Sequence, residues 1–148
     1  MIKYVLFLFL AISCSSQDKI IQENNLSASY EAWVAGVRGG GSGITFFVDL
    51  NIPLENDIEL KRVIFRGYEA LFKKQDALHF AATIITAGNQ QKTAINEGQT
   101  SIRPPSTATL AENEAILIFS INGKEVKQTI KKVKEKPMLQ YPSVKPKF

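Results

Sequence analysis

The residues best suited to chemistry in this sequence are a glycine-rich run and a single histidine. The run consists of Arg38, Gly39, Gly40, Gly41, Ser42 and Gly43. A glycine-rich loop can present backbone N–H groups to an anion or another ligand. This run contains no lysine and precedes a predicted strand rather than a helix, so it does not match a phosphate-binding P-loop. We therefore expect a hairpin or bulge loop that needs positive φ, with anion or ligand contact as the alternative.

Ser42 and His79 are the pair from which a small hydrolase could be built. Ser42 would be the nucleophile, and His79, the sole histidine, would be its general base. Ile44 stands where the Gly-x-Ser-x-Gly elbow of serine hydrolases requires its last glycine. Because a lone histidine in a strand is more often structural or exposed, the hydrolase is the least favoured function, and we assign no catalytic residue.

Acidic residues gather near the expected turns, at Asp49 with Glu55 and Asp57, and at Glu112 with Glu114. Paired carboxylates can serve as general acid and base, but acidic residues near turns rarely form such pairs. The segment 55–57 also lacks the Asp-x-Asp-x-Asn spacing of a calcium loop. We predict neither a metal site nor a cofactor.

The N-terminus has the pattern of an export signal. Lys3 precedes an unbroken apolar run over residues 4–12, which is too short to span a bilayer, since that takes about 20 residues. Ser13 supplies the small residue expected before a cleavage site, and the only cysteine of the chain, Cys14, follows it. Residues 1–13 are therefore expected to be a signal peptide.

Residues 10–14, Leu-Ala-Ile-Ser-Cys, resemble the lipobox of bacterial lipoproteins, with Ala11 where leucine is commoner. The resemblance implies that Cys14 is lipidated and becomes the acylated N-terminus after cleavage. Two or three acyl chains hold a protein stably on a membrane, whereas one chain holds it only reversibly. Ser15, rather than Asp, follows Cys14, which in lipoprotein sorting implies the outer membrane, on a face that the sequence does not indicate.

Residues 30–46 contain the run Trp-x-Ala-Gly-x-x-Gly-Gly-Gly-Ser-Gly. This segment resembles the opening of a group of small lipoproteins from Bacteroidetes-type bacteria, which combine a lipobox with a short β-rich body. The resemblance implies an envelope lipoprotein and adds no activity.

The remaining sequence alternates short apolar runs with turn residues, at a spacing typical of an all-β domain. We predict an antiparallel β-sandwich of seven or eight strands, with a partly closed β-barrel as the alternative. Residues 68–74 also have good helix composition, so strand or helix stays open there, although the neighbouring segments favour a strand. The expected strands are 29–38, 44–51, 59–66, 68–74, 77–86, 114–121 and 124–133.

Alternation within these strands predicts the core and one turn. In 59–66 it places Lys61, Val63 and Phe65 on one face. Asn122-Gly123 is the favoured dipeptide of a type I′ hairpin turn. The expected core residues are Trp33, Phe46, Phe65, Phe80, Phe119 and Ile121.

We divide the mature chain into three parts. Residues 14–28 are expected to be the lipidated cysteine and a flexible tether, and residues 29–136 the β-sandwich. Residues 137–148 are expected to form an extended tail, because Pro137, Pro142 and Pro146 oppose a helix.

The C-terminal part is basic, with eight lysines and two glutamates from residue 124 to residue 148. A lysine-rich strand is typical of a guarded sheet edge, and it could also lie against anionic lipid headgroups. The absence of arginine there and the expected export argue against nucleic acid as a partner.

Length and composition fit one folded domain, since the chain has 148 residues, 45% of them hydrophobic and 22% charged. We expect a membrane-anchored, non-catalytic module that binds a protein or glycan partner at the envelope. The alternative is a structural or accessory subunit of an envelope complex.

Overall fold

The computed structural model describes residues 19–90 and 110–141, and the statements below concern those residues. Apart from the short 3-10 helix η1 (Glu23–Asn25), the regular structure there is all strand, as predicted, and residues 68–74 form a strand. The strands are β1 (Leu26–Ala35), β2 (Gly40–Leu50), β3 (Ile58–Phe65), β4 (Tyr68–Lys74), β5 (His79–Gln90), β6 (Ala115–Ile121), β7 (Lys124–Ile130) and β8 (Lys134–Tyr141).

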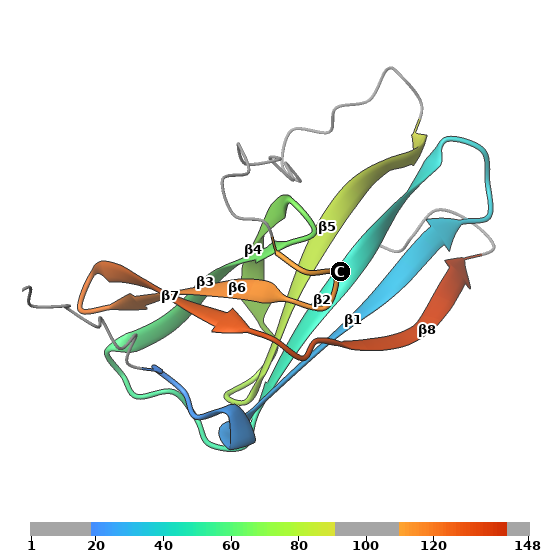
Figure 1. Cartoon of the computed structure of the whole chain (residues 1–148). Coiled ribbons are helices and arrows are strands. Elements are labelled where there is room, and N and C mark those ends of the chain that lie inside the picture. Colours follow the sequence, from blue (N-terminus) through green and yellow to red (C-terminus); the bar gives the residue numbers. More distant parts are fainter. Residues whose placement is uncertain (1–18, 91–109, 142–148) are drawn as a thin grey trace, which may run out of the picture.

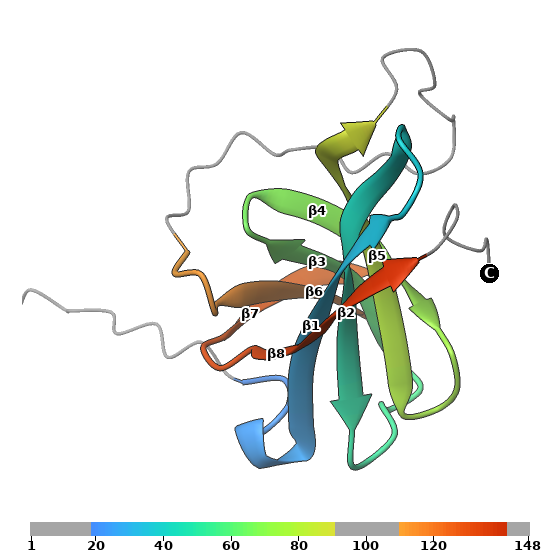
Figure 2. The same cartoon turned by 90° about the vertical axis from the view of Figure 1, so that its right-hand side faces the viewer.

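The strands form a single sheet in the order β7-β6-β3-β4-β5-β2-β1-β8. All neighbours are antiparallel except β1 and β8, which run parallel, so the antiparallel prediction is wrong for this one pair. β4 bends the sheet, because its residues from Tyr68 to Leu71 pair with β3 and those from Phe72 to Lys74 pair with β5. As a result β7, β6 and β3 cross over the layer of β5, β2, β1 and β8 (Figures 1 and 2). The sheet is folded over like a sandwich and is not closed into a barrel.

The core lies between these two layers. In β2, Ile44, Phe46, Val48 and Leu50 are all buried, as the alternation predicted. The ring of Phe46 meets that of Phe65 in β3 across the layers, with 5.1 Å between centroids. Aromatic contacts of this kind add to the burial of apolar area that stabilises the fold.

Four of the six predicted core residues belong to this cluster: Phe46, Phe65, Phe80 and Phe119. Trp33 is buried, with 4% of its surface exposed, but it lies outside the cluster. Ile121 is only partly buried, so that prediction is wrong. It is the last residue of β6 before the turn, where the layers cover it less.

The predicted inward position of Lys61 is also wrong. The ladder between β3 and β6 shifts register between Leu60 and Arg62, so Lys61 is an extra, bulged residue. The bulge lets both Leu60 and Val63 point inward, although they are three positions apart, and both are buried.

Two hairpins use two-residue turns with positive φ at both positions. Asn122 and Gly123 have φ values of 50° and 80°, which confirms the predicted turn. Arg66 and Gly67, with 50° and 79°, form the equivalent turn between β3 and β4. The Asn122 N–H also donates to the Asp57 carbonyl at 3.2 Å, which attaches this hairpin to the loop before β3.

Both ends of the domain extend beyond the predicted boundaries. β1 begins at Leu26, and Ile20 and Ile21 pack against the core, so residues 19–28 belong to the fold and do not form a tether. β8 runs to Tyr141, so residues 137–141 are part of the sheet rather than a tail. Pro137 is accommodated because β8 is an edge strand and the register with β1 shifts at this point. Cys14, residues 1–13, which were predicted to be a signal peptide, and residues 142–148 lie outside the described residues.

The turn at Gly123 gives a direct test of the β6–β7 hairpin. We expect Gly123→Val to lower the free energy of unfolding by more than about 1 kcal/mol, because a β-branched residue tolerates positive φ poorly. Gly123→Asn is the matched control and should cost less, since asparagine adopts this region readily. Urea denaturation of the two variants measures the difference, and equal losses would contradict the turn geometry.

Candidate functional site

The glycine-rich run forms the end of the β1–β2 hairpin and the first residues of β2. The Gly40 N–H donates to the Val37 carbonyl at 3.1 Å and closes the turn. Gly41 has a φ of 88° and lies at a register shift between β2 and β5, so it occupies a β-bulge. The predicted backbone role is therefore confirmed at this position. Arg38 is exposed.

Gly43 is required by the close approach of Trp33. These two residues are cross-strand partners, and they face away from the core because their neighbours Ala32 and Ile44 face inward. A Cβ atom at position 43 would clash with the Ile84 carbonyl oxygen and lie 2.6 Å from Trp33 Cζ2. The indole thus takes the space that a side chain on β2 would otherwise occupy.

Ser42 and His79 lie near opposite ends of the ladder between β2 and β5. Ser42 is opposite Thr86, with 2.8 Å between their hydroxyl oxygens, whereas His79 is opposite Asp49. Seven positions along β2 separate these two pairs, which at about 3.3 Å per residue exceeds 20 Å. A nucleophile and its base must lie within hydrogen-bond reach, so this pair does not form a hydrolase centre.

His79 instead belongs to the turn between β4 and β5. The Asp76 carboxylate accepts the backbone N–H groups of Leu78 and His79 at 2.8 and 2.9 Å, and it contacts His79 Nδ1 at 2.7 Å. The hydrogen bond from the Leu78 N–H, and then that from the His79 side chain, lower the pKa of Asp76. The side chains of Asp76 and His79 are both exposed. This is an aspartate-centred turn, which explains both residues structurally.

Two of the acidic residues singled out in the sequence, Glu114 and Asp57, also have side-chain contacts at turns. Glu114 Oε2 accepts the Ala111 N–H at 3.1 Å, and Asp57 Oδ2 lies 3.4 Å from Asn122 Nδ2. In the part of the chain that the structure describes, no three acidic, histidine or cysteine side chains gather as metal ligands would.

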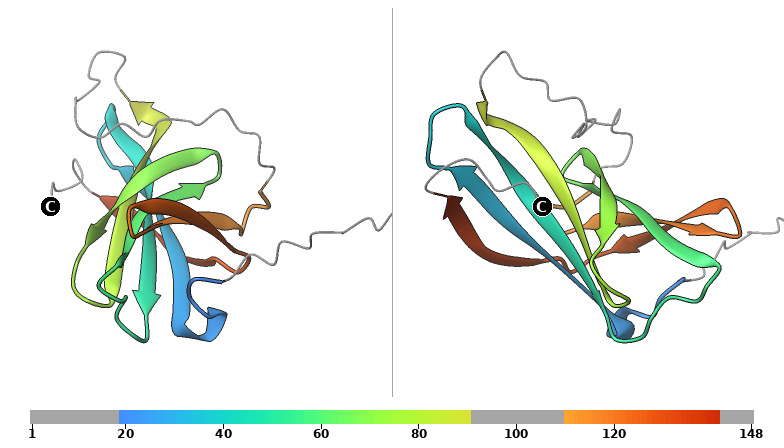
Figure 3. Two further views of the ribbon diagram at one scale, coloured as in Figure 1. Left: turned by 90° about the vertical axis from the view of Figure 1, so that its left-hand side faces the viewer. Right: turned by 180° about the vertical axis from the view of Figure 1, so that it is seen from behind.

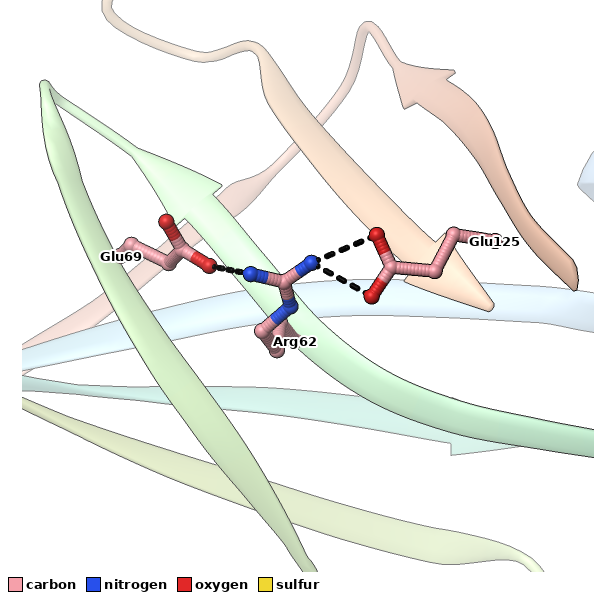
Figure 4. A network of polar contacts seen from close by, with 3 residues as sticks. All are labelled: Arg62, Glu69 and Glu125. Carbon is pink, nitrogen blue, oxygen red and sulfur yellow. Dashed lines mark hydrogen bonds and ion pairs between the residues drawn. The ribbon is translucent and has the colours of Figure 1, made fainter. Parts of the chain in front are cut away.

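Two arginines that the sequence did not single out organise the polar contacts of the β3 layer. Arg62 bridges Glu69 of β4 and Glu125 of β7, and its Nη2 contacts both Glu125 oxygens, at 2.7 and 2.8 Å (Figure 4). Its cross-strand neighbour on the same outward face is Ile118, which is buried outside the core cluster. Because such neighbours lie about 5 Å apart, the Arg62 network covers Ile118.

Arg66 connects the β3–β4 turn to β1. Its guanidinium carbon lies 4.6 Å above the ring of Tyr30, and its Nη2 donates to the Tyr30 hydroxyl at 2.7 Å. Burial, together with a hydrogen bond to Glu135 of β8, raises the pKa of Tyr30. Arg66 and Tyr30 therefore join one layer of the folded sheet to the other, which is a structural role.

The segment before β1 is held by Gln128 of the edge strand β7. The Gln128 side chain is buried, accepts the Ile21 N–H at 3.0 Å and donates to the Ile21 carbonyl at 2.8 Å. This amide satisfies both backbone groups of Ile21, as a neighbouring strand would. The chain therefore enters the domain at a fixed point beside β7.

Of the two edge strands of the described sheet, β8 is the one that carries large exposed apolar side chains. Met138 and Leu139 are 56% and 44% exposed, and Leu139 is the register partner of Trp33. On the same outward face Lys136 Nζ lies 4.3 Å from the ring centroid of Phe47. We call Phe47, Lys136, Met138 and Leu139 the β8 surface. The sequence analysis missed it, because residues from 137 onward were expected to form a tail.

The packing of Trp33 on Gly43 predicts a large effect from a small substitution. Gly43→Ala should lower the free energy of unfolding by about 1–3 kcal/mol, the usual range for overpacking. Ser42→Ala, one residue away, should cost about 1 kcal/mol or less, because it removes one hydroxyl hydrogen bond. Thermal denaturation compares the two, and a tolerated Gly43→Ala would show that the indole does not lie over this glycine.

The Gln128 contact predicts a local opening. Gln128→Ala leaves the N–H and carbonyl of Ile21 without this partner, at a cost of about 1–3 kcal/mol. Faster hydrogen exchange at the Ile21 amide and earlier proteolytic cleavage near residue 21 should follow, whereas Thr129→Ala, at the exposed next position, should change neither. Unchanged exchange in Gln128→Ala would mean that other contacts hold the segment.

Comparison with known proteins identified no relative of this chain. No protein-family model, no curated protein and no solved structure matches the chain. Among the described residues, no helix is long and apolar enough to cross a membrane. The proposals below therefore depend on the residues of this chain alone.

Proposed function

We propose that the protein is a lipoprotein of the cell envelope, anchored by lipid in the outer membrane, and that its β domain is a non-catalytic binding module. The partner we favour is a protein segment that binds at the β8 surface. The observation that carries this proposal is an edge strand with two exposed apolar residues, Met138 and Leu139.

The anchor is supported by the sequence that precedes the domain. The only cysteine of the chain follows a short apolar run at the place where the lipobox pattern requires it. Ile20 and Ile21, six and seven residues later, already pack against the core of the domain. Acyl chains on Cys14 would therefore hold a folded domain close to the bilayer.

A protein partner is favoured by the character of β8. As the last strand of the described sheet, β8 pairs with β1 on one side, and its other side can accept an added strand. Exposed apolar side chains beside such an edge supply pockets and contact area for alternate residues of the partner.

A glycan is the less favoured partner. Sugar rings stack on open aromatic faces, and on the β8 surface Lys136 already lies over the ring of Phe47. An enzyme is also less favoured, because Ser42 and His79 are far apart along the β2–β5 ladder.

Substitution of the anchoring residue tests the first part of the proposal. We expect Cys14→Ser to prevent incorporation of labelled palmitate and to move the protein from the membrane fraction to the soluble fraction or leave it unprocessed. A variant that is processed and still sediments with membranes after a salt wash would show that the protein is not a lipoprotein.

Site-specific photo-crosslinking in intact cells tests the second part. Crosslinkers at positions 138 and 139 should give discrete protein adducts, whereas the control positions 52 and 71, which are also apolar and are more exposed, should not. Adducts at all four positions, or at none, would contradict a binding role for β8. Copurification of one partner at fixed stoichiometry would favour the accessory-subunit alternative.

A further inference from the structure

We propose that the corner between β7 and β8 faces the membrane, and that Lys19, Lys131 and Lys132 there bind anionic lipid headgroups. We call these three residues the lysine corner. The inference deepens the proposed function, on which it rests for the anchor at Cys14, by naming the surface of the domain that contacts the bilayer.

The first support is the fixed entry point of the chain. Gln128 holds the backbone of Ile21 against β7, and Ile20 and Ile21 pack on the core. The segment that begins at Cys14 therefore joins the domain beside the end of β7. This segment could become longer only if the hydrogen bonds between Gln128 and Ile21 broke and Ile20 and Ile21 left the core. The bilayer to which Cys14 is attached must lie near this side of the molecule.

The second support is the length of the connection. Five peptide units separate Cys14 from Lys19, and a fully extended chain spans about 3.5 Å per residue, so the reach is at most about 18 Å. Screened electrostatic attraction acts over about 8 Å at physiological ionic strength. The connection therefore allows the lysine corner to come within the range at which headgroup charge is felt, and its length holds Lys19 at most about 10 Å outside that range.

The third support is the charge of the corner. All three lysines are exposed, and Lys19 Nζ contacts the carboxylate of Glu23 at 2.9 Å. The ion pair with Lys19 lowers the pKa of Glu23, and the charges of Lys132 and Lys131 add to the effect, which places both near this carboxylate. Asp18 precedes Lys19 in the sequence, so three lysines stand against the carboxylates of Asp18 and Glu23, which leaves a net positive charge at this corner.

The far side of the molecule supplies a control. The end of β4, which carries the exposed Lys73 and Lys74, lies on the opposite side from the β7–β8 connection in the two side views (Figures 2 and 3). If anionic lipid bound any exposed pair of lysines, it would bind Lys73 and Lys74 as well as Lys131 and Lys132. A bilayer held at the lysine corner should contact Lys131 and Lys132 but not Lys73 and Lys74.

The experiment uses the mature chain that begins at Cys14, attached through the Cys14 thiol to a maleimide phospholipid. The attachment makes the test independent of acylation in cells. Vesicles contain phosphatidylcholine alone or mixed with phosphatidylglycerol. Lysine reactivity is then measured by acylation with a water-soluble ester and mass spectrometry, and the sole cysteine ensures one point of attachment.

We expect phosphatidylglycerol to lower the reactivity of Lys131 and Lys132 about fivefold, the factor that corresponds to about 1 kcal/mol per lysine near an anionic surface. Lys73 and Lys74 should not change, and high salt should restore the reactivity of the corner. Phosphatidylglycerol should also lower the reactivity of Lys19, and this effect should become smaller in the double variant Lys131→Gln/Lys132→Gln. The control double variant Lys73→Gln/Lys74→Gln should leave the effect on Lys19 unchanged.

Equal reactivity of Lys131 and Lys132 on both kinds of vesicle would overturn the inference, as would equal protection of both lysine pairs. These outcomes leave the proposed lipoprotein function untouched, because that depends on palmitate labelling of Cys14 in cells. Conversely, an unlabelled Cys14 would remove the native anchor and leave the vesicle result standing as a property of the surface.

Discussion

Phe46 and Phe65 face each other across the folded sheet, and this contact depends on a change of partner within β4. The first residues of β4 pair with β3 and its last residues pair with β5, so one continuous sheet supplies both layers. Phe72, at the start of the second part, also reaches the ring of Phe46, at 6.2 Å. Because the sheet turns over at a central strand, β7 and β8 are the two edge strands of the described sheet and do not pair with each other.

The two edges differ in chemistry, and both proposed surfaces follow from that difference. β7 carries exposed lysines, its Gln128 holds the backbone of Ile21, and Lys131 and Lys132 of the lysine corner follow it directly, so charge and the entering chain both protect this edge. β8 has a proline at the register shift and then exposes Met138 and Leu139, so it is less protected. A lipid surface suits the first edge, and an added peptide strand suits the second.

Local patterns in the sequence were sufficient where the nearest residues decide the conformation. Asn122-Gly123 predicted its turn, because positive φ at two successive positions is a property of the dipeptide itself. The alternation from Ile44 to Leu50 predicted the buried face of β2. Lys61 was assigned to the wrong face, because a bulge depends on the register with β6, which no local pattern reveals.

By itself the sequence determined an all-β domain, its hairpin turn at Asn122-Gly123, most of its aromatic core and the lipobox-like segment that ends at Cys14, because these depend on residue type and short-range periodicity. The tertiary structure alone decided that β8 joins β1 in parallel, that Gln128 holds Ile21, and that Ser42 and His79 lie far apart. Each of these relations joins residues distant in the chain. Their pairing is selected by the competition of all strands for backbone hydrogen bonds and burial, and not by any one segment.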